Sequence, residues 1–143
     1  MKNLQINGII IQGLRSASGL NGHGGNGTIA KQKPFFELAG VKRVGSWYNG
    51  TINVDISPKE FKILKPDHIV TCEWLPNITE TFWLVNVELK HNNKFYPSYI
   101  YYPCPSEVKA HPDTTIEIIT EHIQSLNYGD EVTIIIEDGS IEI

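Results

Sequence analysis

Short runs of β-branched and aromatic residues, each bounded by turn-forming residues, recur along the whole chain of 143 residues. In several runs apolar residues alternate with polar ones, which is the pattern of a strand with one buried face. Many short strands at this spacing, separated by turn signals, are typical of a small closed barrel. We therefore predict a mainly β fold with seven or eight short strands. The runs span residues 5–12, 51–56, 68–74, 81–89, 95–102, 115–119, 131–137 and 140–143.

Three other segments carry helix signals. Residues 33–41 are expected to form a short helix, since Pro34 is tolerated in its first turn. Residues 57–65 begin with Ser57, a proline and, three residues after the serine, a glutamate, which together predict a capped helix start. Residues 121–126 are expected to form one helical turn. The prediction is thus a small closed β-barrel with two or three short helices.

Glycine and asparagine residues mark the expected breaks and turns. Gly8 interrupts the first run and predicts a bulge or a bend there. Residues 91–94 predict a hairpin turn, and Asp138-Gly139 predicts a type I′ hairpin that returns the chain onto residues 140–143.

Composition and charge limit the function classes. A hydrophobic content of 41% and a charged content of 20% suit one globular domain over residues 1–143. A net charge of -4 gives no electrostatic footprint for nucleic acid, although Lys31, Lys33, Lys42 and Arg43 are a candidate local basic patch. No apolar run is long enough for a membrane span, and the start has no signal-peptide pattern, so we expect a soluble, cytoplasmic protein.

The two cysteines, Cys72 and Cys104, lie far apart and lack the spacing of metal ligands. We expect them to be buried or free thiols rather than a zinc site or a disulfide.

Residues 13–27 hold six glycines among serine, asparagine and histidine residues. A glycine-rich loop directly after a strand can turn its backbone N–H groups toward an anion such as phosphate. The same composition also suits a plain surface loop, and neither a Walker motif nor a dinucleotide fingerprint is complete here.

The turn and strand at residues 48–56 place Thr51, Asn53 and Asp55 on one face, because side chains alternate along a strand. A hydroxyl, an amide and a carboxylate are oxygen donors of the kind that Mg²⁺ prefers. An ordinary turn followed by a solvated strand face is the alternative reading of this stretch.

The sequence contains no nucleophile elbow, no HExxH and no CxxC motif. One coherent site can still be drawn, with a glycine loop for phosphates, Thr51 and Asn53 for a metal ion, and a carboxylate to orient a hydroxyl. Phosphoryl transfer depends mainly on such positioning and on charge neutralisation.

Several short motifs, in their order along the chain, resemble the archaeal-type, CTP-dependent riboflavin kinases. The run Gly50-Thr51-Ile52-Asn53-Val54 is similar to that family's Gly-Thr-Leu-Asn-Val signature. The remaining counterparts follow in the family's order. They are the glycine loop at residues 19–27, Phe35-Phe36, His111-Pro112, Ile116-Glu117-Ile118-Ile119 and Gly129-Asp130-Glu131-Val132.

The resemblance covers nearly the whole chain and implies a cradle-loop barrel that transfers the γ-phosphate of CTP to the ribityl hydroxyl of riboflavin, giving FMN. It implies that Thr51 and Asn53 bind Mg²⁺ and that Glu117 contacts the flavin or its ribityl chain and takes the catalytic role. Lys109 falls at a substrate-binding position. The implied nucleotide-binding residues are Gly22, Gly24, Gly25, Asn26, Gly27, Thr28, His122 and Gln124.

The chain departs from the family pattern mainly on the nucleotide side. The family tends to have threonine where Lys109 stands, residues 15–21 look like an insertion, and the basic residues usual after the Ile-Glu-Ile-Ile run are absent. The alternative is therefore a non-catalytic flavin- or nucleotide-binding barrel. A third reading, an interaction module for nucleic acid or protein, has only the barrel class and the basic patch in its favour.

Overall fold

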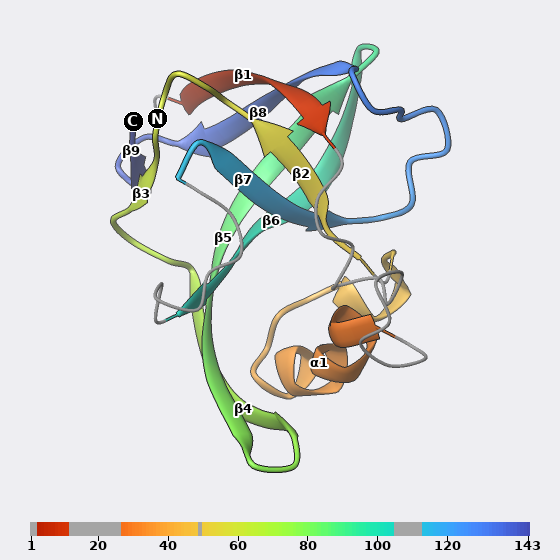
Figure 1. The fold of residues 1–143 in the computed structure, drawn as a ribbon, viewed down its shortest axis with the longest axis vertical. Coiled ribbons are helices and arrows are strands. Elements are labelled where there is room, and N and C mark those ends of the chain that lie inside the picture. Colours follow the sequence, from red (N-terminus) through yellow and green to blue (C-terminus); the bar gives the residue numbers. More distant parts are fainter. Residues whose placement is uncertain (1–2, 12–26, 49, 105–112) are drawn as a thin grey trace.

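The computed structural model describes residues 3–11, 27–48, 50–104 and 113–143. This part of the chain is mainly β, as predicted, with one α-helix and one 3-10 turn (Figure 1). The elements are β1 (Asn3–Ile11), α1 (Gly27–Leu38), η1 (Val44–Ser46), β2 (Ile52–Asp55), β3 (Lys62–Ile63), β4 (His68–Leu75), β5 (Ile78–His91), β6 (Lys94–Cys104), β7 (Thr115–Thr120), β8 (Glu131–Glu137) and β9 (Ile141–Glu142).

Six of the described strands close into an antiparallel barrel in the order β5-β6-β7-β2-β1-β8, because β8 also pairs with β5. The closed barrel that the strand spacing predicted is thus confirmed. The second half of β5 belongs to the barrel, while its first half pairs with β4 in a ribbon that extends away from it (Figure 1).

Side-chain alternation along β5 supplies two different hydrophobic clusters. Val85, Val87 and Leu89 point into the barrel, where they pack with isoleucine and valine side chains of the other strands. Phe82 and Leu84 point to the opposite face and form a second cluster with α1. The outer face of the sheet is therefore also buried wherever α1 covers it.

The helix begins at Gly27 rather than at residue 33, so the predicted helix was misplaced, and Pro34 lies in its interior. Ile29, Gln32 and Phe36 are buried and recur at the spacing of one helix face. The Phe36 ring packs edge-on against Phe82 with a centroid distance of 5.4 Å. This packing stabilises the helix, although a proline in a helix interior is unfavourable.

The other two predicted helices were wrong. In residues 57–65 the backbone N–H of Ser57 donates to the Asp55 carboxylate at 2.9 Å, and the chain turns instead of entering a helix. Phe61 and Ile63 are then buried while Lys62 is exposed, which is a period of two and not of 3.6. Residues 121–126 form turns without a helix.

The two predicted hairpins had different outcomes. Asn92 and Asn93 both have positive φ, as a type I′ turn requires, and they join β5 to β6 as predicted. At Asp138-Gly139 only Gly139 has positive φ, so the turn is not type I′. The following strand β9 pairs with β3 rather than with β8, so that predicted hairpin was wrong.

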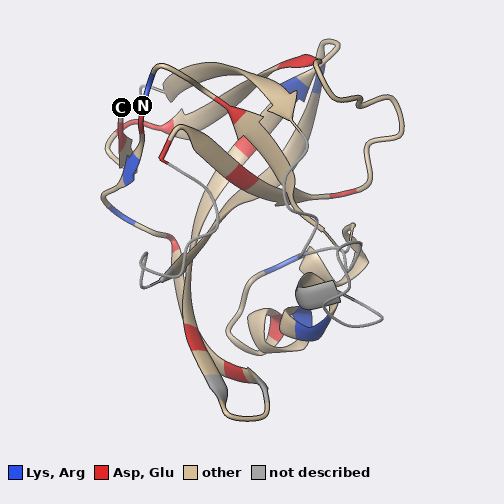
Figure 2. Cartoon of the chain, in the orientation of Figure 1, with Lys and Arg blue, Asp and Glu red and all other residues tan. Residues whose placement is uncertain are grey.

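No helix among the described residues has the length and apolar character needed to cross a membrane. Lys and Arg residues occur in α1, in the segment after it and at several places on the barrel, and Asp and Glu residues are likewise spread over the chain (Figure 2). Lys33 is buried, so the predicted basic patch does not extend to it. Cys72 is a buried free thiol, as expected, and the Cys104 side chain lies outside the described residues.

Candidate functional site

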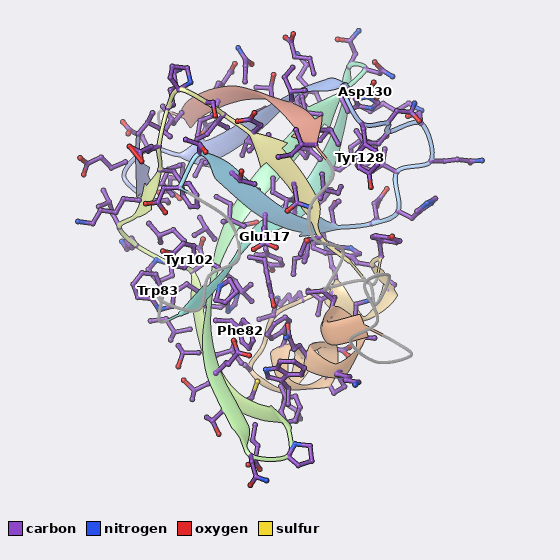
Figure 3. The ribbon with its side chains drawn as sticks, viewed as in Figure 1. Phe82, Trp83, Tyr102, Glu117, Tyr128 and Asp130 are labelled. Atoms are coloured by element: carbon purple, nitrogen blue, oxygen red, sulfur yellow. The ribbon has the colours of Figure 1, made fainter. Side chains whose placement is uncertain are left out.

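Three of the predicted site residues come together on the outer face of the barrel. Asn53 on β2 lies directly opposite Glu117 on β7 in the strand register. The Thr51 hydroxyl, just before β2, donates to Glu117 Oε1 at 3.3 Å across 66 residues of sequence. Figure 3 labels Glu117 on β7. We refer to Thr51, Asn53 and Glu117 as the triad.

Asn53 carries the strongest chemical signal in the triad. Its side chain is 7% exposed, and its Oδ1 atom is buried without a hydrogen-bond partner among the described residues. Leaving a buried acceptor unsatisfied costs about 1–3 kcal/mol, and such an atom calls for a missing water or ion. A hydroxyl, an amide oxygen and a carboxylate on neighbouring strands are suitable ligands for a hard cation.

Tyr101 on β6 lies beside the carboxylate of the triad. The phenol is buried at 6% exposure, and its hydroxyl donates to Gln32 Oε1 on α1 at 2.8 Å. Burial, with the negative charge of Glu117 as a further cause, raises the pKa of Tyr101 well above its ordinary value. The phenol therefore keeps its proton at neutral pH.

Lys33, the next residue of α1, is also buried, and its ammonium group donates to the Trp47 carbonyl. Burial lowers the pKa of Lys33, while the Glu37 carboxylate opposes that shift. The contact fixes α1 against the segment that leads to Thr51.

Two of the residues predicted for the nucleotide, His122 and Gln124, lie in the segment that follows β7. His122 packs its ring against Tyr48 with a centroid distance of 5.7 Å, and both side chains are exposed. His122 is five residues beyond Glu117, at most about 17 Å along an extended chain, and Gln124 is exposed in the turn that follows.

Part of the predicted phosphate loop has a different structure from the one expected. Gly27 and Thr28 are the first residues of α1 and not loop residues. Gly22, Gly24, Gly25, Asn26 and Lys109 lie outside the described residues.

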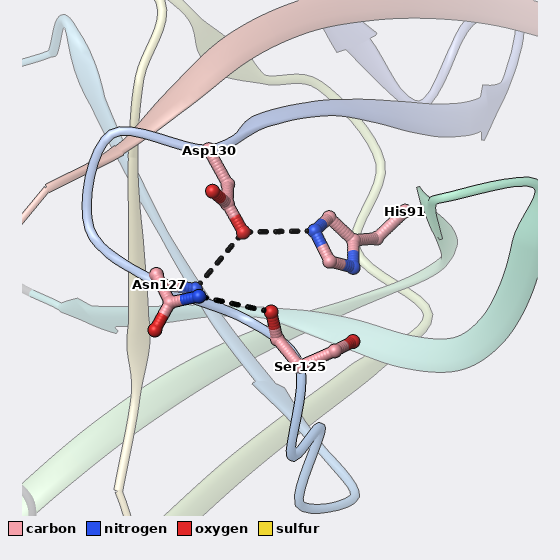
Figure 4. A network of polar contacts seen from close by, with 4 residues as sticks. All are labelled: His91, Ser125, Asn127 and Asp130. Carbon is pink, nitrogen blue, oxygen red and sulfur yellow. Dashed lines mark hydrogen bonds and ion pairs between the residues drawn. The ribbon is translucent and has the colours of Figure 1, made fainter.

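A second polar cluster lies at the end of β5 (Figure 4). His91 is 3% exposed, and its Nε2 lies 2.9 Å from Asp130 Oδ2. The same oxygen accepts the backbone N–H of Asn127 at 3.0 Å, and the Asn127 side chain donates to the Ser125 carbonyl. The described residues contain no group of three or more histidine, cysteine or acidic side chains that could hold a metal ion. We interpret this cluster as a structural tie between β5 and the turn before β8.

The Asp130 cluster leads to a prediction about stability and pH. The backbone N–H of Asn127, with a further contribution from His91, lowers the pKa of the Asp130 carboxyl below its ordinary value. Its folded pKa is below its unfolded value of about 4. The carboxylate therefore stabilises the fold above that pH, and the contribution disappears as pH falls through the folded pKa. We expect Asp130→Asn to be less stable than the wild type at pH 7, with a difference that shrinks at pH 3, in urea unfolding.

Asp138→Asn, in an exposed turn, is the matched control and should show no such pH-dependent difference. A stability difference for Asp130→Asn that grows on acidification would contradict the assignment.

The sequence reasoning missed Gln32 and Tyr101 as neighbours of the site. Tyr101 belongs to a tyrosine-rich strand in which no single tyrosine is distinguished by pattern, and Gln32 lies in a segment that was not predicted to be helical. The only usable signal was a polar side chain between Ile29 and Phe36 on what proved to be the buried helix face.

No protein-family model matches the chain, and no curated protein matches its sequence significantly.

Proposed function

We propose that this protein is a Mg²⁺-dependent phosphotransferase of the CTP-dependent riboflavin kinase type, which transfers the γ-phosphate of CTP to riboflavin and releases FMN. The observation that carries the proposal is the buried Asn53 Oδ1 atom, which has no partner among the described residues. It lies in register with the Glu117 carboxylate, which accepts a hydrogen bond from the Thr51 hydroxyl.

Thr51 and Asn53 fit the role of magnesium ligands. A hydroxyl that donates its proton to a carboxylate still has lone pairs to offer to a cation. Mg²⁺ is commonly held by one or two protein oxygens, with the rest of its shell from water and substrate phosphates. The ion would supply neutralisation of the charge on the transferred phosphoryl group.

Glu117 suits the role of the group that orients the acceptor hydroxyl. It is the carboxylate of the triad, half-buried and close to a neutral phenol. A carboxylate within hydrogen-bond reach of an attacking hydroxyl can align it and accept its proton. His122 and Gln124, with the exposed Tyr48 ring, are then proposed for the nucleotide side, together with the glycine-rich residues 22–28, and Lys109 for the substrate.

The test is an assay with riboflavin, Mg²⁺ and CTP or ATP in which FMN is measured by chromatography with fluorescence detection. We expect FMN with the wild type and at least about 100-fold less with Thr51→Val, since even an outer partner of a metal ligand is worth 10–100-fold. Thr71→Val is the matched control, because the Thr71 hydroxyl pairs with Thr81 on the exposed part of the β4–β5 ribbon. Absence of FMN with every nucleotide would refute the kinase proposal.

A non-catalytic flavin- or nucleotide-binding barrel is the second candidate. It is favoured by one observation: the turn after β7 holds His122 and Gln124, with exposed side chains, where the riboflavin kinases that the chain resembles usually have basic residues. A rise in melting temperature with FMN or CTP, without turnover, would support this candidate over the kinase.

A further inference from the structure

We infer that Gln32 is a positioning residue for the triad: by accepting the hydrogen bond of the Tyr101 hydroxyl, it keeps that hydroxyl from donating to Glu117, so that the carboxylate orients Thr51. This inference rests on the proposed metal site and assigns a role to α1 in it. Gln32 and Tyr101 are themselves not metal ligands in this scheme.

The strand register places Tyr101 and Glu117 side by side. The last paired residues of β6 and β7 are Ile100 and Ile118, which point into the barrel. Tyr101 and Glu117 each lie one residue further along the paired strands and on the opposite face, and adjacent strands are about 4.8 Å apart. The charge of Glu117 acts on the Tyr101 phenol, which is the electrostatic sign of the same proximity.

The Tyr101 hydroxyl has one proton and therefore one bond to donate. In the structure this proton goes to Gln32 Oε1 at 2.8 Å, where both side chains are buried, Gln32 at 1% exposure. A phenol that donates to a carboxylate makes a charge-assisted bond, which is stronger than a bond to an amide. Without Gln32 we expect the buried hydroxyl to turn toward Glu117, because a buried donor without a partner costs free energy.

A hydrogen bond from Tyr101 would draw the Glu117 carboxylate toward the phenol and so disturb its hydrogen bond with Thr51, although its two oxygens can accept several bonds. It would neutralise part of the charge that the cation senses and would loosen the orientation of Thr51. Gln32 and Tyr101 should then have opposite effects: loss of the amide harms the triad, whereas loss of the hydroxyl does not.

The experiment uses Gln32→Leu, Tyr101→Phe and the double variant in the full chain, with Mn²⁺ binding followed by electron paramagnetic resonance. We expect about 10-fold weaker Mn²⁺ binding in Gln32→Leu, near wild-type binding in Tyr101→Phe, and recovery of binding in the double variant. Gln5→Leu on the exposed side of β1 and Tyr128→Phe, which is largely exposed, are matched controls. A double variant that binds Mn²⁺ as weakly as Gln32→Leu would overturn the inference, since a merely structural loss is not repaired by a second loss.

A metal-free measurement separates this inference from the proposed function. In Gln32→Leu the ¹³C chemical shift of the Glu117 carboxyl at pH 7 should move as Tyr101 turns toward it, and it should return toward the wild-type value in the double variant. An unchanged shift in Gln32→Leu overturns the inference whatever the metal data show. A wild type that binds no Mn²⁺ while these shifts behave as expected refutes the metal site and keeps the Gln32 role.

Discussion

Replacement of Asn53 by leucine is expected to raise the free energy of unfolding by about 1 kcal/mol and to abolish magnesium-dependent activity. The Oδ1 atom of Asn53 is buried without a partner among the described residues, so the folded state bears its desolvation cost. Leucine has a similar volume and no polar atom, and its neighbours across the strands include Ile11. The variant removes a destabilising feature and a metal ligand in one change.

Urea unfolding measures the first effect, and FMN formation with Mn²⁺ binding measures the second. Activity should fall by at least about 100-fold, the upper end of what an outer partner of a metal ligand contributes. Asn86→Leu is the matched control on an exposed position of β5 and should change neither property by much. A destabilised Asn53→Leu that still binds Mn²⁺ normally would show that Asn53 is held for structure and not for a cation.

The strands were predictable because the alternation of apolar and polar residues within each strand indicates which of its residues are buried. Val85, Val87 and Leu89 alternate with polar residues, and the alternation is visible without any partner strand. The pairing of strands is less local. The dipeptide Asp138-Gly139 is typical of a hairpin, yet only Gly139 has a positive φ, and β9 pairs with β3 rather than with β8. A dipeptide predicts a turn but does not determine which strand the segment after the turn pairs with.

The helix shows the opposite case, in which tertiary packing overrides local signals. Pro34 predicted a helix that starts at residue 33, but the burial of Ile29 and of Phe36 against Phe82 stabilises a helix that begins six residues earlier, at Gly27. Gln32 acquires its contact with Tyr101 only because the helix lies where it does. A contact that depends on how two elements dock cannot be derived from the pattern of either element.

The residues of the triad also differ in how far the sequence alone could predict them. Thr51 and Asn53 belong to one predicted strand, so their common face followed from alternation alone. Glu117 is 66 residues from Thr51, and only the resemblance pointed to it before the register of β2 and β7 placed it opposite Asn53. The resemblance also named His122 and Gln124; the structure shows His122 against the Tyr48 ring and Gln124 exposed in the turn beyond it.

Gly8→Ala is expected to destabilise the fold by about 3 kcal/mol, the upper end of what overpacking a core usually costs. The pairing of β1 with β8 runs regularly through Gly8, so the predicted bulge is absent. Glycine is needed for close approach instead: a Cβ there would lie 2.4 Å from Val54 Cγ1 and 2.9 Å from the Asp55 carbonyl oxygen. Both atoms belong to β2, so β2 must move away from β1.

That movement reaches the site, because Asn53 directly precedes Val54 and pairs with Ile11 of β1. We therefore expect Gly8→Ala to weaken Mn²⁺ binding by about 10-fold as well, in a protein that urea unfolding shows to be folded. Gln5→Ala, on the exposed side of β1, should change neither quantity. Shortening the Val54 side chain should relieve part of the strain. We therefore expect the double variant Gly8→Ala, Val54→Ala to be about 1 kcal/mol more stable than the sum of the two single effects predicts. Strict additivity would mean that Gly8 is not required by its contact with Val54, and unchanged metal binding would mean that β2 can shift without disturbing Asn53.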